Sequence, residues 1–151
     1  MTLAQRVAAS ASFWNDEETV NDQIQAVMII AQQKHFRPKS IVALDVDRKA
    51  RHLASVSNLP EALAARALIV YHLTEQRPMM SAFLDALGIP HEDGVIKDDR
   101  VAFDGSKLAP AVAAIVAQYP AQDVVLYLNT LVCQDPDTWR ALTAIVTELH
   151  A

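Results

Sequence analysis

Apolar residues recur along most of the chain at spacings of three and four, the period of an α-helix that buries one side. The longest apolar segment, residues 59–89, instead carries apolar side chains on every side of a helix. A helix of that kind is normally buried by neighbours on several sides. The pattern therefore predicts an all-α fold, a compact bundle of about seven or eight helices around a central buried helix at residues 60–77.

Prolines and capping residues mark where the expected helices begin and end. Pro78 cannot donate a hydrogen bond to the preceding turn, so we expect the central helix to break there. A second helix should follow as far as Gly88, which suits a C-cap. Asp135 precedes Pro136 in the order typical of a helix start. With 151 residues, the chain fits a single helical domain over residues 1–151.

A long helix is expected in the segment DEETVNDQIQAVMIIAQQKHF, which begins at Asp16. Acidic residues occupy its first turn and basic residues its last, as the helix dipole favours. We expect a single buried side on this helix, formed by Val20, Ile24, Val27, Met28, Ile30 and Ala31.

The segment that begins at Pro38 leaves two interpretations open. Its apolar residues fit a helix over most of its length, whereas apolar–polar alternation holds over only a few residues. We therefore expect a helix, on which Asp45 and Asp47 are surface groups. In a strand, the two carboxylates would share a face, which would favour a metal site there.

All three glycines of the chain lie in residues 88–105, which marks this stretch as the extended irregular region. Apolar pairs flank the polar residues 97–100 within it. This arrangement predicts a small β-hairpin near residues 95–103, lying against the helices because an isolated ribbon is marginally stable.

Charge and composition exclude several classes of protein. The formal net charge is −5 and the basic residues form only short patches, such as Lys34–Lys39, so we predict no nucleic-acid partner. No apolar run reaches membrane-spanning length, and the N-terminus lacks the apolar core of a signal peptide, so we expect a cytoplasmic protein without a membrane contact. The lone cysteine, Cys133, is expected to be a small buried apolar group.

Candidate chemistry gathers near the predicted helix break and in the irregular region. His72 and Glu75 lie three residues apart and can share a helix face, with Arg77 just beyond. His91 and Glu92 follow Pro90 on a loop, where they could act as acid and base. The other interpretation is a core histidine and ordinary turn residues. The spacing matches no metal motif, so no metal is predicted, and no cofactor is identified.

The sequence therefore predicts a helical protein that acts through protein–protein contact, most simply as a homo-oligomer. The apolar residues of the N-terminal helix and of the last helix motivate this expectation. These residues are Leu3, Val7, Trp14, Trp139, Ile145 and Leu149. The alternative is a small enzyme or ligand-binding protein with its site between the central helices and residues 88–105.

Overall fold

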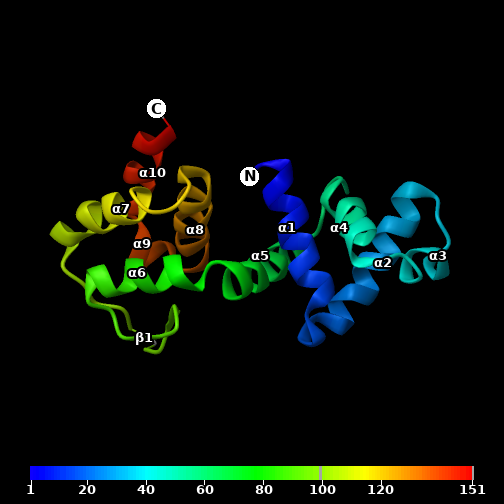
Figure 1. Cartoon of the computed structure of the whole chain (residues 1–151), viewed down its shortest axis with the longest axis horizontal. Coiled ribbons are helices and arrows are strands. Elements are labelled where there is room, and N and C mark those ends of the chain that lie inside the picture. Colours follow the sequence, from blue (N-terminus) through cyan, green and yellow to red (C-terminus); the bar gives the residue numbers. More distant parts are fainter. Residues whose placement is uncertain (99, 151) are drawn as a thin grey trace. The chain divides into compact units, whose positions relative to one another are not determined.

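The computed structural model describes residues 1–98 and 100–150, and 74% of this part is helical (Figure 1). It contains ten α-helices, and its β-structure is one two-stranded antiparallel hairpin, so the predicted all-α fold is confirmed. The chain divides into two compact units, Met1–Glu75 and Gln76–Ala151. The expectation of a single domain stays a prediction.

The first unit has five α-helices and one short 3₁₀ helix. They are α1 (Leu3–Asn15), η1 (Glu17–Thr19), α2 (Val20–Lys34), α3 (Pro38–Val42), α4 (Val46–Ala54) and α5 (Glu61–Glu75). Helix α1 packs against α4 and α5, and α2 against α3. The segment that follows Pro38 is thus helical, as expected, but it forms two helices because Asp45 caps the second: its carboxylate accepts the Arg48 amide at 2.8 Å.

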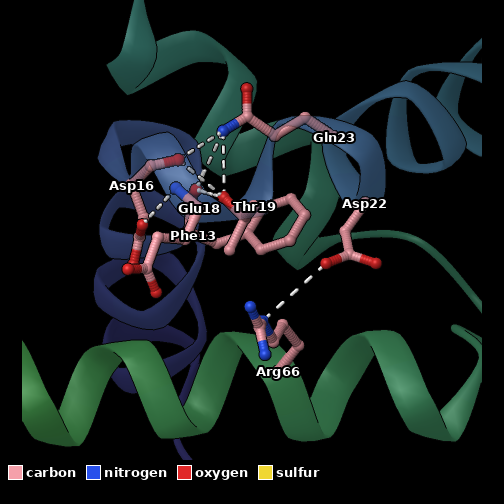
Figure 2. A network of polar contacts seen from close by, with 7 residues as sticks. All are labelled: Phe13, Asp16, Glu18, Thr19, Asp22, Gln23 and Arg66. Carbon is pink, nitrogen blue, oxygen red and sulfur yellow. Dashed lines mark hydrogen bonds and ion pairs between the residues drawn. The ribbon is translucent and has the colours of Figure 1, made fainter.

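The turn between α1 and α2 is held by polar side chains (Figure 2). The Thr19 hydroxyl, which is fully buried, donates to the carbonyl oxygen of Phe13 at 2.6 Å. The Gln23 amide nitrogen lies 3.0 Å from the carbonyl oxygen of Asp16 and 3.3 Å from that of Phe13. The last carbonyls of a helix have no partner within the helix. These contacts satisfy them and fix the direction in which α2 leaves α1.

The core of the first unit forms where α1, α2, α4 and α5 meet. Phe13 and Ile30 are completely buried at its centre, and α5 contributes Leu63 and Ala67. Helix α5 ends at Glu75, and the next helix starts with Pro78 in its first turn, so the predicted break is confirmed.

The second unit contains the remaining elements. They are α6 (Arg77–Leu87), β1 (His91–Glu92), β2 (Val95–Ile96), η2 (Gly105–Lys107), α7 (Leu108–Val116), α8 (Ala121–Gln134), α9 (Pro136–Trp139) and α10 (Leu142–His150). Gly88, with a φ of 70°, caps the end of α6, and Asp135 caps α9, both as expected. The expected last helix is split into α9 and α10.

The small hairpin is present but lies nearer the N-terminus than residues 95–103. His91 pairs with Ile96 and Glu92 with Val95, and the two residues between the strands are Asp93 and Gly94. Both have positive φ, 52° and 91°. An Asp-Gly pair is among the strongest sequence signals for such a two-residue turn, because glycine and aspartate tolerate this backbone conformation.

Aromatic residues form the centre of the second unit. The ring of Phe83 on α6 meets Tyr127 on α8 edge to face, with centroids 5.7 Å apart. Trp139 is 2% exposed and stacks on Phe103 at 5.2 Å. Burial raises the pKa of Tyr127 well above its ordinary value.

Candidate functional site

His72 is a buried residue of α5. Its Nδ1 lies 2.8 Å from the carbonyl oxygen of Leu68, and its ring meets that of Tyr71 edge to face. Because a carbonyl oxygen can only accept, Nδ1 carries the proton and donates it. Glu75, three residues later, is exposed. Burial therefore separates the two side chains that the sequence placed on one face, and His72 has the surroundings of a core histidine.

His91 is held from both sides of its ring. Its Nε2 lies 2.6 Å from Oδ1 of Asp85 on α6, and the Gly94 amide donates to its Nδ1 at 3.0 Å. This pattern fixes the tautomer, since Nδ1 must be the acceptor and Nε2–H the donor. Both nitrogens are thus engaged, and in this state His91 offers no lone pair to a metal or to a substrate proton.

Arg77 holds the other end of the same hairpin. Its Nη1 lies 3.0 Å from the carbonyl oxygen of Asp93 and 3.7 Å from its carboxylate. Arg77 and Asp85, near the start and the end of α6, therefore clamp the hairpin onto the helix. Glu92 on the hairpin is exposed. The structure thus brings Arg77 and His91 to one hairpin, whereas the proposed five-residue site itself stays a prediction.

The remaining chemistry of the irregular region is local capping. Asp104 accepts from the hydroxyl and the amide of Ser106, and these two donors lower the pKa of its carboxyl. Within residues 1–98 and 100–150, no three His, Cys, Asp or Glu side chains gather closely enough to hold a metal ion. Cys133 is exposed, so the expectation that it is buried is wrong.

An unexpected apolar surface lies on α2 and α3. Val20, Ile24 and Met28 are 53%, 62% and 55% exposed, and Val42 on α3 is 60% exposed. The prediction that Val20, Ile24 and Met28 belong to the buried side of their helix is therefore wrong. Only Ala26, Val27, Ile30 and Ala31 of this helix are buried. We call Val20, Ile24, Met28 and Val42 the α2–α3 face.

The sequence contained a signal for this face. At 100° per residue, the apolar positions of α2 from Ala26 round to Met28 span roughly 200° of the helix circumference, about twice the stripe that a surface helix needs for one core. One part of such an arc can face the core, and the rest must point elsewhere. An arc of this width indicates a helix with a second apolar contact.

A groove of about 340 Å³ runs beside this face. It is lined by Trp14, Val20, Gln23, Ile24, Val27, Met28, Pro38, Val42 and Lys49. The Lys49 ammonium lies 5.4 Å from the centre of the Trp14 ring, a cation–π contact at the groove wall. Lys49 is the one charged side chain of this lining, so the groove suits an apolar occupant.

Polar contacts hold α2 so that the α2–α3 face points outward. Gln23 ties the helix to the end of α1, and Asp22 lies 3.8 Å from the guanidinium of Arg66 on α5 (Figure 2). Turning the face inward would break both contacts. Its exposure is therefore built into the packing of the first unit.

A second, smaller hollow of about 200 Å³ lies between α1, α4 and α5. Its wall is made largely of alanine and leucine side chains, with Arg6 as the charged residue. The alanines account for the hollow, because larger side chains at these positions would fill it.

Comparison with known proteins places the chain in no group: no family model, curated protein or solved structure matches it. Among the described residues, no helix has both the length and the apolar character needed to cross a membrane.

Proposed function

We propose that the protein acts through protein–protein contact and that the α2–α3 face is its contact surface. The observation that carries this proposal is the gathering of four apolar side chains, each more than half exposed, along one groove. Contiguous exposed apolar patches of this kind commonly mark interaction sites, whereas single exposed apolar residues need no explanation.

The energy available from this face fits a reversible complex. Full burial of a Val, Ile or Met side chain contributes about 1.5–3 kcal/mol, so four side chains that are slightly more than half exposed contribute roughly 3.5–7 kcal/mol. Association costs about 4–15 kcal/mol in lost freedom. A partner that brings a similar apolar surface therefore reaches a modest affinity.

The proposed surface differs from the one that the sequence suggested. Trp14 and Trp139 are 7% and 2% exposed, so each is used within its own unit. Leu3, which the sequence also suggested, is 60% exposed on α1, but four exposed apolar side chains gather on α2 and α3. We also propose a cytoplasmic location, which the single cysteine supports because a reducing compartment keeps an exposed thiol such as Cys133 free.

Site-specific photocrosslinking tests the proposed surface. A photoreactive amino acid at position 24, within the face, should give covalent protein adducts in cells that produce the chain. The matched control is position 95, because Val95 is also an exposed apolar residue, 42% accessible, but lies on the hairpin. Val42→Asp should suppress the adducts from position 24. Equal adducts from positions 24 and 95 would contradict the proposal.

A further inference from the structure

We propose that the partner of the α2–α3 face is a second copy of this chain, bound so that the two α2 helices run antiparallel. This inference depends on the proposed function, and it names the partner of the same surface. In such a twofold contact the same residues are used by both copies, so the face must be complementary to itself.

The shape of the face meets this requirement. Val20, Ile24 and Met28 form a ridge along α2, and this ridge is also one wall of the groove, whose other side is formed by residues of α1, α3 and α4. A twofold axis places the ridge of each copy over the groove of the other. Ridge-into-groove packing is the ordinary way in which two helices meet.

The charges at the two ends of α2 select the antiparallel direction. Asp16, Glu17 and Glu18 precede the helix, whereas Lys34 ends it and Arg37 and Lys39 follow. Two antiparallel copies bring the acidic end of each helix to the basic end of the other. A parallel pair would place acid against acid and base against base, which costs affinity.

The flank of the ridge is uncharged and tolerates a copy of itself. Asn21, Gln25 and Gln32 are exposed along it and carry no charge. Asp22 is turned toward Arg66 instead. The first unit as a whole is also neutral, with eight basic and eight acidic residues in positions 1–75, so two copies of it do not repel each other through net charge.

One register matches both the apolar ridge and the charged ends of α2. If Ile24 of one copy lies opposite Met28 of the other, positions equally far from the midpoint face each other. Glu18 then lies opposite Lys34 of the second copy at both ends of the contact. The apolar centre and the charged ends are thus satisfied by the same alignment.

Charge exchange tests the inference by analytical ultracentrifugation of the full chain at micromolar to several hundred micromolar concentration. The acid exchange is Glu17→Lys with Glu18→Lys, and the base exchange is Lys34→Glu with Arg37→Glu. Each alone should weaken self-association about tenfold or more, because attraction becomes repulsion at both ends. All four changes together restore opposite charges and the original net charge, and should bring affinity back to within about threefold of the wild type.

Controls separate this effect from misfolding and from general charge. Asp137→Lys with Glu148→Lys changes the net charge as much as the acid exchange but lies in the second unit, so it should leave association unchanged. Ser55→Ala removes the hydrogen bond that Lys34 donates at 2.8 Å within its own copy and keeps the lysine charge. Circular dichroism should show unchanged helix content in every variant.

The combined exchange decides between a second copy and another partner. If the four-fold variant self-associates as weakly as the acid or base exchange alone, the proposal that the partner is a second copy is wrong. It is also wrong if the wild type is monomeric at several hundred micromolar. A monomeric wild type whose position-24 probe still forms an adduct of another mass would leave the proposed function standing. A monomer without adducts would remove both.

Discussion

The three glycines of the chain allow one sharp test of the second unit, because each lies in a different environment. Gly94 sits in the hairpin turn with a φ of 91°, and a Cβ atom there would be 2.9 Å from Cβ of Met80 and 3.3 Å from the carbonyl oxygen of Arg77. Gly88 has a φ of 70° but nothing within 4 Å, and Gly105 has neither feature. Alanine substitution at the three positions therefore separates backbone strain from steric contact.

The magnitudes follow from these environments. Gly88→Ala should lower the free energy of unfolding by about 1–2 kcal/mol, the cost of a left-handed backbone for an L-residue. Gly94→Ala should cost a further 1–3 kcal/mol or so, because Met80 and the α6 backbone must shift to admit the methyl group. Gly105→Ala should be neutral or stabilise by up to about 1 kcal/mol through the unfolded chain.

Denaturant unfolding followed by tryptophan fluorescence measures these differences. Each unit contains one tryptophan, so the series is made in a Trp14→Phe background in which Trp139 reports on the second unit. The background change also removes an indole N–H that is buried without an acceptor among the described residues. If Gly94→Ala costs no more than Gly88→Ala, the hairpin does not lie against α6 as described.

Three further predictions concern single side chains. Gln23→Ala should lower the free energy of unfolding in urea by about 0.5–1.5 kcal/mol, because the carbonyls at the end of α1 lose one of their side-chain donors and keep Thr19, whereas Gln32→Ala at an exposed position should change it by less than about 0.5 kcal/mol; equal effects would refute the role of the turn. Burial raises the pKa of Tyr127, so unfolding is favoured as the pH rises above about 10, where the phenol of the unfolded chain ionises first. In Tyr127→Phe the free energy of unfolding should therefore decrease less steeply with pH above about 10 than in the wild type, and an unchanged slope would contradict this. The hydroxyl and amide of Thr138 lower the pKa of Asp135, so the stability that this carboxylate contributes is present above the unfolded pKa of about 3.9 and is lost on acidification. The free energy of unfolding of Asp135→Asn should therefore fall less steeply with acidification than that of the wild type, and identical acid profiles would refute this.

The helices could be predicted from the sequence because their signals are local. Pro78, Gly88 and the Asp135–Pro136 pair act through the backbone of their own turn, and the structure has a helix boundary at each. The predicted hairpin lies too far toward the C-terminus, because the apolar residues that predict it are a weaker local signal than the Asp93–Gly94 dipeptide.

The candidate sites could not be predicted to the same degree, because they depend on contacts between elements. The sequence places His72 and Glu75 on one face of a helix, but it does not say that packing buries one and exposes the other. Likewise, the ring of His91 is occupied by Asp85 and Gly94, partners that only the return of the chain onto α6 supplies. For α2, the apolar arc was visible, but which part faces the core depends on Gln23 and Asp22.

The clamp between α6 and its hairpin also bears on how the second unit folds. All its contacts, from Arg77 to Ile96, join residues that are close in sequence, so little chain entropy is lost in closing them. The stacking of Phe103 on Trp139, by contrast, must wait for a much longer loop to close. Structures built from local contacts form fast, so α6 and the hairpin should be largely ordered in the folding transition state. Gly94→Ala should then slow refolding far more than it accelerates unfolding, which makes this residue a kinetic marker for the first step of assembly.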